Sequence, residues 1–340
     1  MRLFLLDKMN ERKFLNIELI RFFGILLIMG HHLYLLGFEG DYLFRNCWTW
    51  VDLFFILTGA LTYKHFETSE DEAKKYGTNA LRYTFRKFGR FFLLTIVSVL
   101  CMVFLCYGFM LFNHERKAFL SALADSVYEM LFLSSAGFVS ALNAPIWFLS
   151  ASFIVLPIIC YLIQAKKELW KVLSLLIPVL YFGYFGVNSS RAWPNDLIRA
   201  AACMALGTFA YLVSKVIREK FSEKKPLIIL LSVCEILAVI IAGAISITGF
   251  DAVNILELLF LIIITLMLSG VTVSSGIKGK FPEFLGKMSM PMFIFHWVIG
   301  YVSTYLSESV RVRTCIFYIG TLLFGIIYTL IVTGVKHGKT

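Results

Sequence analysis

Long apolar segments recur between residues 14 and 335, and they constrain the fold more than any other feature of the chain. Each is close to the roughly 20 residues that an α-helix needs to cross the hydrocarbon core of a bilayer. The composition agrees, because 59% of the residues are hydrophobic and 16% are charged, whereas soluble domains are about half apolar and about a quarter charged. We therefore expect an all-α, polytopic integral membrane protein, and a water-soluble enzyme is excluded.

The apolar segments predict about ten transmembrane helices in a single transmembrane domain that covers residues 1–340. We place these spans near residues 14–36, 46–65, 88–112, 145–164, 169–187, 194–214, 226–248, 252–273, 288–306 and 314–335. An even number of crossings puts both termini on the same side of the membrane. Two connections are long: residues 66–87, which we expect to be partly helical, and residues 113–144, part of which can lie along the membrane interface.

The net charge of +10 is explained by where the basic residues lie. If both termini are cytoplasmic, 24 of the 32 Lys and Arg residues fall on the cytoplasmic side and six on the outer side. Such an excess of Lys and Arg in cytoplasmic loops is the positive-inside rule of membrane proteins. It predicts cytoplasmic termini, and it indicates a lipid bilayer rather than nucleic acid as the partner of these charges.

The seven cysteines contain no C-x-x-C pair and no partner histidines at the spacing of a zinc site. Most of them lie within apolar segments. We therefore expect free thiols and no bound metal.

Ionisable side chains inside the predicted spans are the candidate functional residues, because their burial in a membrane is costly. In the first span Arg21 and His32 are eleven residues apart, about 20° from three full helical turns, so they share one helix face. His31 is rotated by about 80° from Arg21, which makes His32 the better aligned histidine. Glu18 can pair with the Arg21 guanidinium, and a purely structural ion pair is the alternative role for these two residues.

Asp52 is the only acidic residue in the second span. Counted from the outer ends of the two spans, His32 is about 6 Å deep and Asp52 about 9 Å deep, so the two can meet. A carboxylate beside a histidine fixes its tautomer and stabilises the imidazolium, as a general base requires. The alternative is a helix-to-helix hydrogen bond without chemistry. In the sixth span we expect Arg199 to pair with Asp196, three residues earlier.

Five segments, in this order, resemble the motifs of the acyltransferase 3 family. They are residues 18–32, 50–59, 86–90, 146–149 and 288–296. The first is similar to the acid-x-x-Arg-x10-His motif that opens the family, the second to G-V-D-x-F-F-x-x-S-G, and the third to R-R-x-x-R. The fourth resembles W-F-L, and the fifth resembles S-x-x-x-Y-L-x-H. Together they extend over nearly the whole chain, and ten spans are what the family is expected to have.

The resemblance implies a membrane-bound acyltransferase in the inner, or cytoplasmic, membrane of a bacterial cell. It implies an acyl-CoA donor from the cytoplasm, acetyl-CoA in the simplest case, and a hydroxyl acceptor on a cell-surface polysaccharide or a lipid-linked sugar. A succinyl donor is a further possibility. A multi-span transporter of a glycan precursor or acylated metabolite is the alternative from another functional class, although the sequence lacks the repeat symmetry typical of such carriers.

The residues that match the family motifs receive roles from the resemblance. The catalytic candidates are His32, Asp52 and Arg21. The candidates for binding the phosphates of the donor at the cytoplasmic mouth are Arg21, Arg86, Lys87 and Arg90, since guanidinium groups hold phosphates bidentately.

The candidates for lining the substrate pocket are Trp147, His296, Ser289 and His31. A buried structural histidine is the alternative for His296, and a place in the interfacial aromatic belt is the alternative for Trp147. Two mechanisms stay open: direct transfer with His32 as general base, and a relay in which His32 carries the acyl group.

Overall fold

The structure is a computed structural model that describes residues 14–37, 43–68, 76–111, 116–138, 141–184, 195–248 and 253–337. All regular secondary structure in these ranges is helical, which confirms the all-α prediction. The α-helices are α2 (Leu15–His31), α3 (Trp50–Thr68), α4 (Tyr76–Tyr107), α5 (Arg116–Met130), α6 (Trp147–Ala165), α7 (Lys167–Tyr184), α8 (Asn195–Phe221), α9 (Lys225–Thr248), α10 (Val253–Ser269), α11 (Lys280–Leu306) and α12 (Val310–His337).

Short 3₁₀ helices lead into or out of several of these elements. They are η1 (His32–Leu36), η2 (Arg45–Thr49), η3 (Gly108–Leu111), η4 (Ser134–Ala136), η5 (Ala144–Ile146) and η6 (Val273–Gly276). Four of them adjoin a long α-helix directly, because η1 continues α2, η3 continues α4, η2 precedes α3 and η5 precedes α6.

Each predicted span coincides with one α-helix, but several helix ends differ from the prediction. The helix α4 begins at Tyr76 instead of residue 88, and α11 begins at Lys280 instead of residue 288. Charged residues such as Lys, Arg and Glu end an apolar segment without ending a helix, because their helix propensity is high. The helix α5 lies inside the long connection 113–144.

Six helical segments of the described chain are long and apolar enough to cross a membrane. They are Leu15–Leu36, Tyr76–Met110, Ala144–Ala165, Asn195–Phe221, Lys225–Thr248 and Val310–Thr333, and α10 contains a shorter apolar segment, Ile255–Ser269. The chain is therefore a multi-pass membrane protein. The count of ten crossings and the cytoplasmic position of the termini stay predictions.

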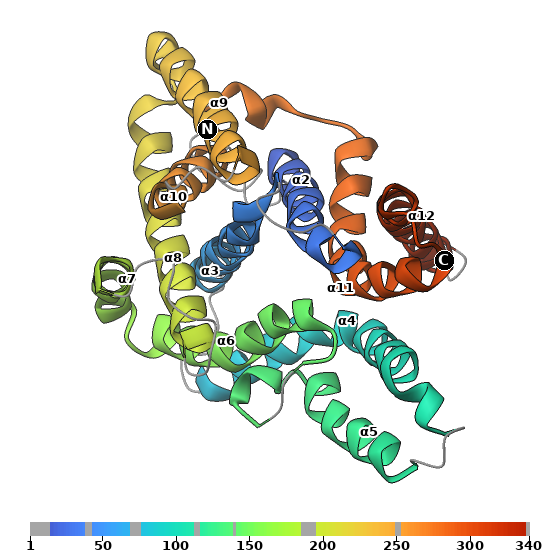
Figure 1. Cartoon of the computed structure of the whole chain (residues 1–340). Coiled ribbons are helices and arrows are strands. Elements are labelled where there is room, and N and C mark those ends of the chain that lie inside the picture. The colour runs from blue at the N-terminus through green and yellow to red at the C-terminus, as the bar shows by residue number, and fades with distance from the viewer. Residues whose placement is uncertain are drawn as a thin grey trace.

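The helices α2 and α3 lie side by side in the middle of the bundle (Figure 1). On one side α3 packs along α8, and on the other side α2 packs along α11. The helices α5, α7, α9 and α12 lie at the periphery (Figure 1). Large apolar side chains such as Ile240 of α9 and Ile331 of α12 are exposed there, as expected for a surface that faces lipid.

The helices α3 and α8 approach each other closely at two glycines. A Cβ atom on Gly59 would overlap the backbone of Met204, and one on Gly207 would overlap the backbone of Ile56. Small residues permit this kind of backbone contact between membrane helices. The two helices run in the same direction, so the N-terminal turns of α3 and α8 lie next to each other.

The helices α2 and α11 also run in the same direction. Near the start of both, Gly286 leaves room for the Glu18 side chain, which a Cβ at that position would overlap. Near the end of α2, His32 meets His296 of α11. These two contacts fix how far α2 is displaced along α11, and they decide which residues face each other between them.

Candidate active site

Two histidines from different helices form a direct hydrogen bond. The Nδ1 atom of His32 lies 3.0 Å from the Nε2 atom of His296. Their rings stack with 5.0 Å between centroids. His296 is fully buried and His32 is 8% exposed. His32 directly follows α2, whereas His296 lies in the middle of α11.

The hydrogen bonds of His296 define the tautomers of both rings. Its Nδ1 atom lies 2.8 Å from the carbonyl oxygen of Phe293 and 3.3 Å from that of Met292. A carbonyl oxygen only accepts, so Nδ1 of His296 carries the proton and, in a neutral ring, its Nε2 atom is an acceptor. The Nδ1–H of His32 therefore donates to His296, and His32 carries its basic lone pair on Nε2.

A small pocket lies beside His32. It is lined by Ile28, His31, His32, Trp48, Val51, Pro145, Trp147 and Phe293. Its volume of about 10 Å³ is near the space that one ordered water needs. The structure thus brings three of the sequence-derived candidates together, namely His31, His32 and Trp147. His296 lies behind His32, so it supports the pocket without lining it.

Two neighbours of His32 have different environments. His31 is half-buried, and its Nδ1 atom lies 3.0 Å from the carbonyl oxygen of Arg45 in η2. The indole ring of Trp297 meets the His32 ring edge-on, with 5.0 Å between centroids. His31 therefore faces the segment that leads into α3, and Trp297 restrains the tilt of the His32 ring.

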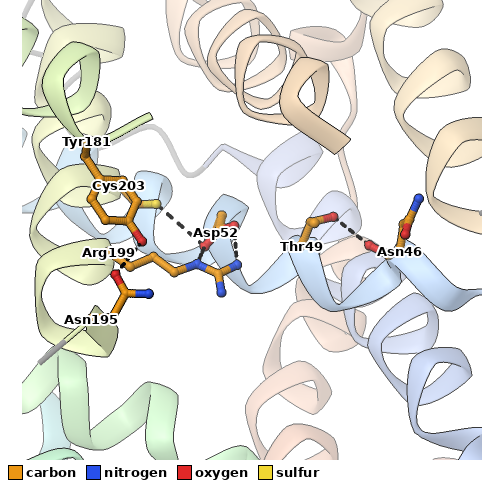
Figure 2. Close-up of polar contacts among 7 residues, drawn as sticks. All are labelled: Asn46, Thr49, Asp52, Tyr181, Asn195, Arg199 and Cys203. Carbon is orange, nitrogen blue, oxygen red and sulfur yellow. Dashed lines mark hydrogen bonds and ion pairs between the residues drawn. The ribbon is translucent and has the colours of Figure 1, made fainter. Parts of the chain in front are cut away.

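Asp52 forms an ion pair with Arg199 of α8, which corrects two expectations from the sequence (Figure 2). The Nε and Nη2 atoms of Arg199 donate to the two carboxylate oxygens of Asp52 at 2.8 and 2.5 Å. The Nδ1 atom of His32 is bonded to an imidazole and not to the Asp52 carboxylate, and the salt-bridge partner of Arg199 is not Asp196. The close packing of α3 on α8 is the physical reason, because it places Asp52 directly over Arg199.

The Asp52–Arg199 pair is buried and touches the wall of the pocket. Both side chains are at most 4% exposed, and the Cys203 thiol adds a contact of 3.6 Å to Asp52 (Figure 2). The Arg199 guanidinium lies over the Trp48 ring at 4.5 Å and near the Trp147 ring at 5.9 Å. Asp52 therefore fixes the cation against which both tryptophans of the pocket pack.

Polar contacts continue on both sides of this pair (Figure 2). The Tyr181 hydroxyl donates to the Asn195 side-chain oxygen at 3.0 Å, at the start of α8. The Thr49 hydroxyl donates to the Asn46 carbonyl oxygen at 2.8 Å, in the turn η2 that carries Trp48. These bonds hold the two chain segments from which Arg199 and Trp48 project.

Basic residues gather one helix length away from the histidines. Arg21 donates to Glu18 at 2.9 Å, which confirms the predicted pair. Lys87 of α4 lies close enough to Arg90 and Arg21 for their positive charges to repel its own, so three of the four candidate phosphate ligands share one region. Arg86 and Arg90 are exposed on α4. Along α2, Arg21 is eleven residues from His32, about 16 Å at the helical rise.

Ser289 is buried in α11 and donates to the carbonyl oxygen of Leu285, one turn earlier, at 3.2 Å. The parallel packing of α2 and α11 puts it near the level of Arg21 and two turns before His296. It is therefore not in the pocket beside His32. The described residues hold no group of three or more His, Cys, Asp or Glu side chains that could bind a metal ion.

A family model described as an acyltransferase domain matches residues 14–335, nearly the whole chain. The chain belongs to the acyltransferase 3 family. No curated protein and no solved structure matches it. Membership of this family indicates an acyltransferase and does not favour the transporter alternative.

Two residues of this candidate site are not among the site residues that the sequence predicts. Trp48 lines the pocket, and nothing in its local pattern separates it from an interfacial tryptophan. The sequence marks Arg199 as an ionisable residue inside a span, but it suggests a partner on the same helix, Asp196. The signal for the true partner was depth, because Asp52 and Arg199 lie at similar distances from the starts of the second and sixth spans.

Proposed function

We propose that the protein transfers an acyl group, acetyl in the simplest case, from cytoplasmic acyl-CoA to a hydroxyl group of a cell-surface polysaccharide or a lipid-linked sugar. The cell membrane of a bacterium is the proposed location. One observation carries the proposal: α2 connects a cluster of cations around Arg21 to a histidine whose basic nitrogen is set by a second histidine.

The cation cluster suits the donor. Acyl-CoA carries phosphates at one end and the thioester at the end of a long pantetheine arm. Arg86, Arg90 and Arg21 can form bidentate hydrogen bonds with phosphate oxygens, and Lys87 adds a point charge. With phosphates at this cluster, the pantetheine arm extends along α2 toward His32, about 16 Å away at the helical rise.

The histidine pair suits the transfer step. The Nε2 atom of His32 accepts the proton of the acceptor hydroxyl as the hydroxyl oxygen attacks the thioester carbonyl carbon. The carbon–sulfur bond then breaks, and the proton passes from His32 to the leaving thiolate. Throughout, the Nδ1–H of His32 stays bonded to His296, which keeps the ring oriented. His296 thus fills the place that a carboxylate occupies in many general-base pairs.

The pocket must widen to accommodate the reacting groups. A thioester and a sugar hydroxyl need more space than the pocket volume of about 10 Å³ provides. Trp48 and Trp147 form one wall, and the ion pair behind them is buried and bonded at both carboxylate oxygens. We therefore expect substrate binding to shift the tryptophan rings while the Asp52–Arg199 pair stays intact.

Mass spectrometry of surface polysaccharide tests the proposed function, because it reports both the group added and its acceptor. Polysaccharide from cells with the gene should carry an ester-linked acyl group that is absent from cells without it. Restoring the intact gene should restore the group, and restoring the His32→Ala variant should not. Identical polysaccharide in all of these cells would reject transfer to a surface glycan.

A further inference from the structure

A buried carboxylate outside the site holds the segment that connects α5 to α6. Glu129, near the end of α5, is 1% exposed. Its Oε2 atom accepts the backbone N–H of Leu142 at 2.8 Å, and its Oε1 atom accepts the backbone N–H of Asn143 at 2.9 Å. Two neighbouring donors thus meet two acceptor oxygens, an arrangement that only an ionised carboxylate satisfies fully.

Ionisation of Glu129 has a cost, which the two amides partly offset. The helix α5 is not among the helices that are long and apolar enough to cross the membrane. Burial raises the pKa of Glu129 to about 7, and the hydrogen bonds from Leu142 and Asn143 act in the opposite direction. Above that pH the carboxylate with two accepting oxygens is the prevailing form.

The segment held by Glu129 is bonded to α11 on both sides of His296. The Asn143 side chain donates to the carbonyl oxygen of Ile294 at 2.9 Å. The Trp297 indole donates to the carbonyl oxygen of Leu142 at 3.2 Å. Trp297 is the residue that contacts the His32 ring edge-on. The two residues whose amides Glu129 binds therefore also fix the α11 segment that carries His296.

The same segment continues directly into the pocket wall. Asn143 accepts the backbone N–H of Ile146 at 2.9 Å and begins the turn η5. Pro145 in this turn and Trp147 after it line the pocket beside His32. Through this segment the Glu129 carboxylate is thus linked both to the histidine pair and to the wall of the pocket.

We propose that Glu129 is a positioning residue that aligns the His32–His296 pair with the pocket wall by binding the Leu142 and Asn143 amides. The role rests on the acyl transfer proposed above. Glu129 touches neither donor nor acceptor, so its loss should impair turnover and leave donor binding intact. A residue that only supports the fold would instead change the amount of folded protein without this separation.

The first test replaces Glu129 by glutamine in the full-length protein. The amide keeps the shape but offers one acceptor, so one backbone N–H loses its partner. At pH 8 we expect kcat for acyl transfer to fall about tenfold and the KM for acyl-CoA to stay within about twofold. The control is Asp125→Asn, which removes an exposed charge one turn earlier on α5 and should change neither value. Unchanged kcat in Glu129→Gln would overturn the proposal.

A double-mutant cycle tests whether the effect travels through Asn143. Asn143→Ala keeps the backbone N–H that Glu129 binds but removes the bonds to Ile294 and to the Ser98 hydroxyl. If both residues act along one connection, the double variant should lose little more kcat than the worse single variant. Fully multiplicative losses would show that Glu129 acts elsewhere and would overturn the proposal.

Hydrogen exchange separates failure of this inference from failure of the proposed function. In Glu129→Gln, amides of residues 141–147 and 292–298 should exchange at least about threefold faster than in the wild type, with the rest of α11 unchanged. Exchange of both segments at wild-type rates would overturn the positioning role, whatever the activity. Wild-type protein that transfers no acyl group would reject the proposed function, and the exchange result would still decide whether Glu129 positions the two segments.

A second variant covers the case in which Glu129→Gln does not fold. Glu129→Asp keeps both acceptor oxygens but shortens the side chain by one methylene. It should fold, lower kcat by about threefold and accelerate exchange in the same two segments to a smaller extent. Wild-type kcat in Glu129→Asp, measured where Glu129→Gln is unfolded, would show a purely structural role and overturn the proposal.

Discussion

His32 and His296 are joined by a hydrogen bond of 3.0 Å between the Nδ1 atom of the first and the Nε2 atom of the second. Because His296 donates its own Nδ1–H to backbone carbonyl oxygens of α11, it accepts from His32 and holds the basic nitrogen of His32 at Nε2. The neutral imidazole of His296 thus fixes the tautomer of His32, the role that the sequence predicted for the Asp52 carboxylate.

Replacement of His296 should therefore lower turnover through the orientation of His32. His296→Leu removes the acceptor and should reduce kcat by about 100-fold, in the range of general-base effects. His296→Gln places a side-chain oxygen near the position of Nε2, and it should recover about tenfold of that loss. The KM for acyl-CoA should change little in both variants. Steady-state kinetics check this, and equal losses in the two variants would contradict the accepting role.

The Asp52–Arg199 pair should be important for stability. Asp52→Asn leaves the Arg199 guanidinium buried without its charge partner, which typically costs about 3–5 kcal/mol. We expect a marked fall in Tm in detergent, and a partial recovery when Arg199→Gln is added. The matched control is Glu67→Gln, which breaks the more exposed Glu67–Lys215 pair between the same two helices and should cost about 1 kcal/mol or less. Similar losses from Asp52→Asn and Glu67→Gln would show that burial of the pair is unimportant.

The basic residues of α4 should bind the donor. Arg86→Ala and Arg90→Ala should each weaken CoA binding about tenfold, because each removes charge-assisted hydrogen bonds to phosphate. Arg82→Ala is the control, since Arg82 is an exposed cation on the same helix, one turn before Arg86. Thermal stabilisation by CoA measures the change. If stabilisation by CoA falls equally in all three variants, the basic residues act only through the general positive charge of the surface, and specific binding by Arg86 and Arg90 is rejected.

Direct transfer and an acyl-histidine relay differ in what the donor does alone. If His32 is a general base, incubation with labelled acyl-CoA and no acceptor should leave no label on the protein, and both substrates must be bound before reaction. A relay would leave label on His32 and give ping-pong kinetics. Mass spectrometry of the peptide that contains His32 distinguishes the two, and a stable acyl group on its imidazole would overturn direct transfer.

Hydropathy was sufficient to place the helices, because each apolar segment of about 20 residues must form backbone hydrogen bonds internally. Side-chain contacts between different helices were harder to predict from the sequence. Asp52 and Arg199 lie six and five residues from the starts of spans 46–65 and 194–214. Because both spans run in the same direction, this similar depth indicates that the two side chains can pair. Asp196, three residues from Arg199 on the same helix, is the simpler partner to predict, and it led to the wrong pairing.

The histidine pair could not be found in this way. His32 lies four residues from the outer end of span 14–36, whereas His296 lies ten residues from the outer end of span 288–306. These unequal depths argue against a contact between the two histidines. The displacement of α11 along α2 depends on side-chain packing such as that of Glu18 against Gly286, and no pattern within either helix shows it.

The most direct test of the central claim is transfer of label from acetyl-CoA to acceptor glycan in membranes that contain the wild type, His32→Ala or His31→Ala. We expect the wild type to label the glycan and His32→Ala to lose at least about 100-fold of that rate, with the protein still folded in the membrane. His31→Ala should lose less than about tenfold, since its Nδ1 atom faces the carbonyl oxygen of Arg45. A rate in His32→Ala within about threefold of the wild type, or a greater loss in His31→Ala than in His32→Ala, would contradict the assignment of His32 as the base.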